Sequence, residues 1–271
     1  MTATIKTAVV TGGGHGIGRA LSRRLHEDGV VVVVVDIDEE AARTVAGELN
    51  GHAFALDVGD ESAIEKLVVT IENDIGPIDL FVSNAGVGFG DGEEGAASKE
   101  GSLHDVGDRW EACWRVNVMA HVFAARSLVP RMIARGGGHL VNVASAAGLL
   151  SQIGDAAYSA TKHAAVAFAE SLAITHGEQG IDVSVVCPQA VATRMIGIED
   201  DSDLMDGGFG GNDVDGILTA DEVADCVVKG IQEKQFLILP HPQVATYVQR
   251  KASDHNRWIA GMRRFRRKLS D

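Results

Sequence analysis

TAVVTGGGHGIG, residues Thr7–Gly18, is the stretch that decides the fold. It begins as a short β-branched run, which predicts a buried strand, and it leads into the helical pattern of Gly16–Asp28. Glycines between a strand and a helix permit positive φ angles and let backbone N–H groups approach an anion. The partial positive charge at the helix N-terminus adds to that attraction. The stretch therefore predicts a strand–turn–helix unit that binds a pyrophosphate.

The rest of the chain repeats the alternation of short apolar runs with longer helical patterns. We expect strands at Thr7–Thr11, Val30–Asp36, His52–Ala55, Ile78–Ser83, Gly138–Ala144, Ile181–Cys187 and Phe236–Leu239. We expect helices near Gly16–Asp28, Glu39–Leu49, Ser62–Ile75, Gly107–Ala134, Ala156–Gly177 and Ala220–Lys234, and a last one over Gln243–Lys268. Most strand runs are apolar throughout, as in strands buried on both faces. The pattern predicts an α/β fold: a doubly wound, Rossmann-like seven-stranded parallel sheet with helices on both faces, in a single domain over residues 1–271.

Two long segments interrupt this alternation. Gly86–Gly107 is rich in Gly, Glu and Ser, and Ile196–Gly216 is acidic and rich in Gly. Both follow the carboxyl ends of expected strands, where ligands bind in sheets of this kind. Loops of this length inside a compact domain are usually functional. We therefore expect lids here, with residues 196–216 as the substrate lid.

Composition excludes several classes of protein. The formal net charge of −14 disfavours a nucleic-acid function for the chain as a whole. The longest apolar run, Val30–Val35, is far too short to span a bilayer, and no secretory signal is visible. Cys113, Cys187 and Cys226 have neither disulfide-framework nor metal-ligand spacing. We expect a cytoplasmic protein without a metal site.

The end of the chain departs from this acidic balance. Residues 263–268, RRFRRK, carry five cations in six positions. Cations suit the C-terminus of a helix, so a solvated or subunit-contacting helix end over residues 243–271 is the favoured interpretation. An arm that binds a polyanion or a membrane surface stays open as the alternative.

Tyr158 and Lys162 are the strongest candidates for chemistry. They lie four positions apart in YSATK, so a helix places both side chains on one face. A fixed positive charge beside a phenol favours the phenolate and lowers the pKa of the tyrosine from roughly 10, before desolvation acts in the opposite direction. Such a tyrosine can exchange a proton with an alcohol or carbonyl oxygen near neutral pH.

Asp36 bears on the choice of dinucleotide. It closes the second expected strand, 24 positions after Gly12. A carboxylate there accepts hydrogen bonds from the adenine ribose and repels a 2′-phosphate. The next residue is Ile37 rather than an arginine that would hold that phosphate. NAD is therefore favoured over NADP, although a protonated His15 would tolerate a phosphate.

Further short motifs follow in order along the chain. They are Asp57-Val58, Asn84-Ala85-Gly86-Val87, Asn117, Ser145, and Pro188 followed by Thr193. Together with the spaced glycines and the Tyr–Lys pair, they make the chain resemble the short-chain dehydrogenase/reductase family from about Lys6 to Leu239. The family commonly has Gly after this proline, whereas this chain has Gln189. That difference affects the expected shape of the substrate pocket.

The resemblance implies a role for each matching residue. The implied catalytic residues are Asn117, which holds a water of a proton relay, Ser145, which binds the substrate oxygen, Tyr158, the acid–base, and Lys162, which binds the nicotinamide ribose and lowers the pKa of the tyrosine. The implied cofactor-binding residues are Gly12, Gly14, His15, Gly16, Ile17, Gly18, Asp36, Ile37, Asp57, Val58, Asn84, Ala85, Gly86, Tyr158, Lys162, Pro188, Val191 and Thr193.

The expected function is an NAD(P)-dependent oxidoreductase, with NAD preferred, that interconverts a secondary alcohol and a ketone. Apolar side chains near the expected pocket suggest a hydrophobic substrate: Leu149, Leu150, Met195, Ile196 and Phe209. The resemblance also implies a homotetramer or homodimer built on the helices Gly107–Ala134 and Ala156–Gly177. The alternatives are a cofactor-sensing or scaffold protein without turnover, an NAD-using lyase or epimerase, and an NADPH-dependent reductase.

Overall fold

The sheet has the predicted doubly wound topology. The structure, a computed structural model, describes residues 5–89, 107–197 and 215–270. Its strands are β1 (Thr7–Thr11), β2 (Val31–Asp36), β3 (His52–Ala55), β4 (Leu80–Ser83), β5 (Gly138–Val143), β6 (Ile181–Val186) and β7 (Leu237–Ile238). All neighbouring strands are parallel, in the order β3-β2-β1-β4-β5-β6-β7. The order reverses between β1 and β4, the position at which ligands bind in such sheets.

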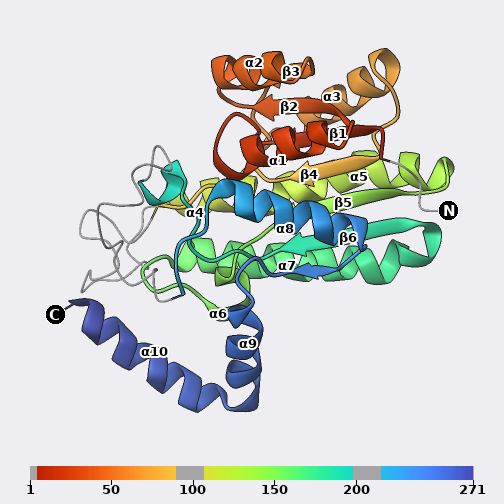
Figure 1. Cartoon of the computed structure of the whole chain (residues 1–271). Coiled ribbons are helices and arrows are strands. Elements are labelled where there is room, and N and C mark those ends of the chain that lie inside the picture. Colours follow the sequence, from red (N-terminus) through yellow and green to blue (C-terminus); the bar gives the residue numbers. More distant parts are fainter. Residues whose placement is uncertain (1–4, 90–106, 198–214, 271) are drawn as a thin grey trace.

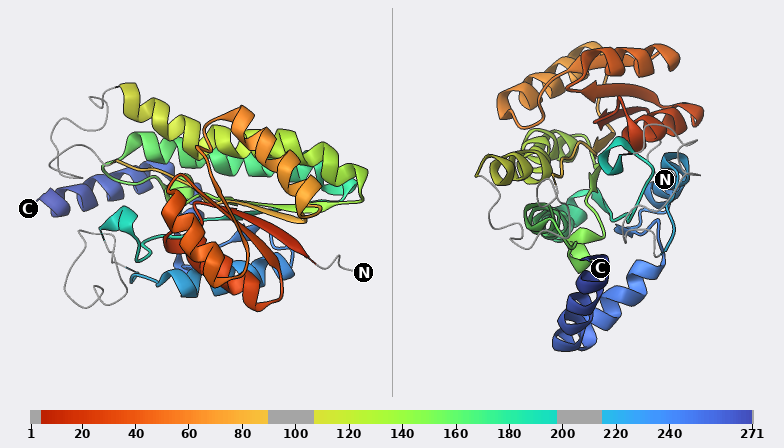
Figure 2. Two further views of the ribbon diagram at one scale, coloured as in Figure 1. Left: turned by 90° about the horizontal axis from the view of Figure 1, so that it is seen from above. Right: turned by 90° about the vertical axis from the view of Figure 1, so that its left-hand side faces the viewer.

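Helices cover both faces of the sheet (Figure 1, Figure 2). They are α1 (Gly16–Glu27), α2 (Glu39–Glu48), α3 (Glu61–Asp74), α4 (Gly107–Trp114), α5 (Ala120–Ala134), α6 (Ala147–Leu150), α7 (Ala156–His176), α8 (Ala220–Gln232), α9 (Gln243–Ser253) and α10 (His255–Ser270). Apolar residues of α1, α2 and α8 form one core layer with the sheet, and those of α3, α5 and α7 form the other. Alternate residues of β1 point into opposite layers, Val10 into the first and Val9 into the second. This is why its sequence is apolar throughout.

Two predicted helices are interrupted. The helix expected over Gly107–Ala134 contains a π-helical turn, Arg115–Met119, between α4 and α5. The helix expected over Gln243–Lys268 is two helices, because Asp254 leaves the helical conformation and accepts a hydrogen bond from the backbone N–H of Arg257 at 2.9 Å. An aspartate at this position caps the start of the next helix.

Most of both predicted lids lies outside the described residues, so the lid assignments stay predictions. Among the described residues no helix has the length and apolar character needed to cross a membrane.

Candidate functional site

The predicted site residues follow neighbouring strands at one edge of the sheet. Because β1, β4, β5 and β6 are parallel and adjacent, their carboxyl ends lie side by side. Gly12, Asn84, Ser145 and Pro188 follow these ends in the same spatial order. The sequence motifs, spread over more than half of the chain, are thereby brought to one edge.

The glycine turn after β1 is tied to the end of β4. Gly12 has a φ angle of +62°, and a Cβ atom added there would lie 2.9 Å from the Cα atom of Ala85. The side-chain amide of Asn84 donates hydrogen bonds to the carbonyl oxygens of Thr11, at 2.9 Å, and Gly12, at 3.2 Å. Asn84 thus holds the turn against the sheet.

Asp36 stabilises the same turn from the end of β2. One carboxylate oxygen accepts a hydrogen bond from the backbone N–H of Gly14 at 2.9 Å, and the other accepts one from Asp38 at 3.1 Å. A Cβ atom at Gly14 would lie 2.9 Å from the Asp36 carboxylate, so this approach depends on glycine. Asp36 is buried, whereas Ile37 beside it is 75% exposed. The carboxylate therefore already serves the turn, a role that the sequence did not predict.

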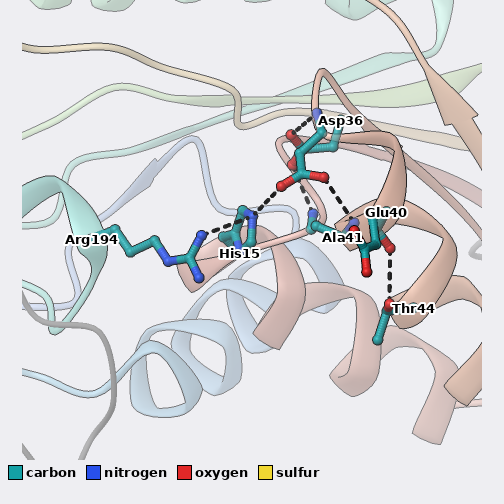
Figure 3. Close-up of polar contacts among 8 residues, drawn as sticks. His15, Asp36, Glu40, Ala41, Thr44 and Arg194 are labelled. Carbon is teal, nitrogen blue, oxygen red and sulfur yellow. Dashed lines mark hydrogen bonds and ion pairs between the residues drawn. The ribbon is translucent and has the colours of Figure 1, made fainter.

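Figure 3 shows Arg194, from the segment after β6, beside His15 of the glycine turn. The Arg194 guanidinium lies 3.3 Å from Nε2 of His15, and the same nitrogen lies 3.4 Å from a carboxylate oxygen of Asp38. Arg194 directly follows Thr193, whose methyl group would lie 2.9 Å from a Cβ atom at Gly16. The segment of Thr193, an implied cofactor-binding residue, and the predicted pyrophosphate turn thus lie against each other. We did not predict Arg194, and its place directly after Thr193 was the available signal.

The other predicted adenosine contacts lie after β3. The Asp57 carboxylate accepts a hydrogen bond from the backbone N–H of Gly59 at 2.8 Å and pairs with Arg115 at 2.6 Å. Val58 is buried and packs with Ile64 of α3. Asp57 therefore joins the end of β3 to the π-helical turn.

Tyr158, Lys162 and Ser145 lie together at the carboxyl edge of the sheet. Asp155 caps the start of α7 by accepting a hydrogen bond from the backbone N–H of Tyr158 at 2.8 Å. One turn later, Nζ of Lys162 lies 5.5 Å from the centre of the Tyr158 ring and donates to the carbonyl oxygen of Val143 at 3.0 Å. The Ser145 hydroxyl accepts a hydrogen bond from the backbone N–H of Ala147 at 3.1 Å and forms a side-chain hydrogen bond with Tyr158.

Burial controls the ionisation of this cluster. Desolvation raises the pKa of Tyr158 to about 12, and the hydrogen bond with Ser145 opposes that change only in part. Desolvation also lowers the pKa of Lys162 to about 8. The expected lowering of the Tyr158 pKa by Lys162 is therefore not seen in the protein without cofactor. The free-energy cost of removing the phenolate from water exceeds the stabilisation that the nearby ammonium provides.

Asn117 lies in the π-helical turn and uses its whole side chain within the protein. Its amide oxygen accepts a hydrogen bond from the backbone N–H of Val87 at 2.9 Å. Its amide nitrogen donates to the carbonyl of Val87 at 2.9 Å and to the hydroxyl of Thr161 at 3.1 Å. A Cβ atom at Gly86 would lie 3.3 Å from both the Asn117 amide oxygen and Nζ of Lys162. The side chain thus joins the loop after β4 to α7.

His121, one turn after Asn117, is a buried residue that we did not predict. It is 2% exposed, and neither ring nitrogen has a hydrogen-bond partner among the described residues. Desolvation and the charge of Lys162 lower the pKa of His121 to about 3, so the imidazole is neutral at physiological pH. Its sequence signal, an isolated histidine in an apolar helix, does not differ from that of an ordinary core residue.

The segment after β6 forms the last wall of the site. The Pro188 carbonyl accepts a hydrogen bond from the backbone N–H of Ala146 at 2.8 Å. The backbone N–H of Gln189 donates to Nδ1 of His241, which is buried, at 3.2 Å. Val191 forms a parallel bridge with Leu218. The half-buried Gln189 is thus fixed by a histidine that we did not predict.

Among the described residues no group of His, Cys, Asp or Glu is arranged to hold a metal ion. His163 and His176, both on α7, bond to local groups: Nδ1 of His163 to the carbonyl of Ser159 and Nδ1 of His176 to the side chain of Gln179.

Known proteins share this arrangement. The family model of the short chain dehydrogenases matches residues 6–202. The chain is 39% identical over 197 residues to the 1-deoxy-11-beta-hydroxypentalenate dehydrogenase of Streptomyces exfoliatus, covering 70% of this chain and 69% of the relative. It is 35% identical over 193 residues to the meso-2,3-butanediol dehydrogenase of Serratia marcescens, covering 70% and 73%. A short chain dehydrogenase/reductase from Burkholderia phymatum, solved in complex with NAD, superposes with a TM-score of 0.81 at 27% identity, covering 94% of this chain and 96% of that one. The chain belongs to the short-chain dehydrogenase/reductase family of oxidoreductases.

Proposed function

We propose that this protein interconverts a secondary alcohol and a ketone with NAD as the hydride carrier. The observation that carries the proposal is the cluster of Ser145, Tyr158 and Lys162, which lies at the carboxyl edge of the sheet beside the glycine turn. A hydroxyl, a phenol and an ammonium together can bind a substrate oxygen and move its proton.

The residues present fit a dinucleotide. His15 begins α1 without a side-chain cap, so the first backbone N–H groups of the helix have no side-chain acceptor. Unpaired N–H groups at a helix N-terminus suit a pyrophosphate. Asn84 and Asp36 hold the turn through hydrogen bonds to Thr11, Gly12 and Gly14. When bound there, the nicotinamide supplies the hydride chemistry.

The protein's own part is to orient the substrate and to handle the proton. Ser145 and Tyr158 hydrogen-bond the substrate oxygen. Because burial keeps Tyr158 protonated at neutral pH, its hydroxyl can donate a proton to a carbonyl oxygen as the alcohol forms. In the oxidation direction Tyr158 must first lose that proton, which the nearby Lys162 charge favours.

The preference for NAD over NADP rests on Asp36. A 2′-phosphate beside this buried carboxylate meets like charge, and the exposed Ile37 offers no cation. Arg194, which lies 3.3 Å from His15, is a cation on the same side. Titration of NADH and NADPH by fluorescence tests the preference, and we expect Asp36→Ser with Ile37→Arg to shift the affinity ratio toward NADPH. An equal shift in Ile37→Arg alone would show that Asp36 does not control the choice.

The activity itself is tested by an NAD⁺-coupled absorbance screen of secondary alcohols, with bulky apolar ones included. Tyr158→Phe is expected to lose about 10²–10⁴-fold in turnover while NADH still binds. The matched control is Tyr247→Phe, which alters the only other tyrosine in the chain. NADH binding without turnover of any alcohol or ketone would favour a cofactor-sensing protein instead.

We also propose a cytoplasmic homotetramer or homodimer that associates through α4, α5 and α7. Ile174 on α7 is 83% exposed, and Trp114 on α4 is 47% exposed. Large apolar groups this exposed suit a subunit contact. Sedimentation velocity tests the assembly, and a stable monomer at micromolar concentration contradicts it.

A further inference from the structure

Positive charge is concentrated at the end of an otherwise acidic chain. Between Gln243 and Ser270 the only carboxylate is Asp254, and the cations are Arg250, Lys251, Arg257, Arg263, Arg264, Arg266, Arg267 and Lys268. The chain as a whole carries a formal charge of −14. Attraction to the C-terminal end of the α10 dipole explains only the cations of the last turn, because the effect falls off within one turn.

These cations lie on helices that stand apart from the layered body. Figures 1 and 2 show α9 and α10 projecting below the sheet and its covering helices, with α10 at the periphery. α9 contacts α6, and α10 contacts α9. Arg263, Arg264, Arg267 and Lys268 are exposed and form no ion pair with the described residues. Nothing in the described body neutralises them.

The same helix has an apolar side. Trp258, Met262 and Phe265 follow one another at spacings of four and three residues, which places them on one side of α10. All three are only half-buried, and Ile259 next to Trp258 is 46% exposed. α10 therefore combines a narrow apolar side that contains an aromatic pair with a densely cationic remainder.

The charges and the apolar side of α10, taken together, indicate what this helix binds. A second α10 would match the apolar side but would bring like charges together. A nucleic acid would match the cations, but it would not require the aligned apolar side. An anionic bilayer matches both, because the apolar side enters the boundary of headgroups and acyl chains while arginine and lysine contact lipid phosphates. We infer that α10 is an interfacial helix that binds the protein reversibly to an anionic membrane surface.

The acidic body does not prevent this contact. Charges beyond the Debye length, about 8 Å at physiological salt, are largely screened, and α10 projects from the body at its edge. With 16 residues, α10 is about 24 Å long and can lie flat on the surface. A single short amphipathic helix gives salt-sensitive binding rather than permanent insertion.

Flotation of the full-length protein with lipid vesicles tests the inference. We expect binding to phosphatidylcholine vesicles that contain about one third phosphatidylserine, and none to phosphatidylcholine alone. Each cation removed lowers the partition coefficient about fivefold, so Arg263→Gln with Arg267→Gln lowers it about 25-fold. The matched control, Arg43→Gln with Lys66→Gln, removes two exposed cations from α2 and α3 and leaves binding unchanged. Phe265→Ser lowers the partition about tenfold through the apolar side.

Several results would overturn the inference. Binding that is equal in the α10 variant and the control variant would place the contact elsewhere. Retention of a DNA duplex without retention of anionic vesicles would assign α10 to a polyanion. If the protein does not bind vesicles, and if the α10 variant sediments as a smaller species than the control variant, then α10 is a subunit contact. Vesicle binding needs no turnover, so its failure leaves the proposed oxidoreductase activity untouched.

Discussion

The two ends of the candidate site handle charge in different ways. At the glycine turn, His15, Asp38 and Arg194 are partly exposed and contact one another. Around Tyr158, Lys162 and His121 are fully buried, and neither has a carboxylate partner among the described residues. The contacts at the glycine turn can be broken at little cost in folding free energy, because exposed ion pairs contribute little to stability. Burial of Lys162 and His121 shifts the pKa values of both groups and reduces the stability of the fold.

This contrast supports the proposal that the first region binds the cofactor and that the second carries out the reaction. Titratable groups with large pKa shifts cluster where a reaction needs them. The following predictions test the contrast by altering one region at a time, beginning with the largest expected effect.

Asn117 should be the most costly single side chain to remove. It forms three hydrogen bonds and is completely buried, so Asn117→Ala removes two hydrogen bonds from the backbone of Val87 and one from the hydroxyl of Thr161. We expect a loss of about 4 kcal/mol in the free energy of unfolding, measured by urea denaturation. A loss below about 1 kcal/mol would mean that the π-helical turn does not depend on this side chain.

Lys162→Met should stabilise the fold at neutral pH while abolishing turnover. The pKa of Lys162 is about 8 in the folded protein against 10.5 ordinarily, so the unfolded chain binds more protons between these values. The free energy of unfolding of the wild type therefore rises with pH through this window. At pH 7 the variant escapes the cost of the buried charge and gains about 2 kcal/mol after the hydrogen bond to Val143 is lost. Thermal unfolding at several pH values measures this gain, which should disappear near the ordinary lysine pKa.

His121 should make the wild type sensitive to acid. The pKa of His121 is about 3 in the folded protein and 6.5 ordinarily. The stability that the neutral imidazole contributes is therefore complete above pH 6.5 and is lost as the pH falls below it. Between the ordinary pKa and pH 5 the loss is about 2 kcal/mol. His121→Leu should not show this part of the loss. His139, with a pKa lowered to about 4 by burial, contributes equally to both proteins. The prediction would be wrong if the urea midpoints of the two proteins fell by the same amount between pH 7 and pH 5.

Arg194→Gln should have the smallest effect. The contact with His15 is exposed, so we expect a roughly threefold weaker affinity for NADH at low salt and a smaller difference at high salt. Arg43→Gln, on the exposed side of α2, is the control. An effect that does not depend on salt would indicate that Arg194 acts through packing rather than charge.

The sequence predicted the site residues better than it predicted their environment. The alternation of apolar runs predicts where the strands lie in the sequence and that they are parallel. The strand order seen in the structure then brings Asn84, Ser145 and Pro188 to one edge of the sheet. The desolvation of Tyr158 is not visible in the spacing of YSATK, because it depends on how completely α7 packs against the sheet.

The sequence also did not predict which residues far apart in the chain contact each other. Arg194 and His15 are separated by 179 positions, and Gln189 and His241 by 52. The break at Asp254 has a local signal, because an aspartate inside a helical pattern can cap the start of a new helix. The helical pattern over Gln243–Lys268 nevertheless predicted a single helix.

Burial, rather than the nearby cation, sets the protonation of Tyr158. Tyr247→Phe leaves Tyr158 as the only tyrosine, so its ionisation can be followed by the ultraviolet absorbance of phenolate as the pH is raised. In the folded protein without cofactor, we predict that Tyr158 keeps its proton past the ordinary tyrosine pKa of about 10 and titrates near 12. Phenolate that appears at or below neutral pH would contradict the account.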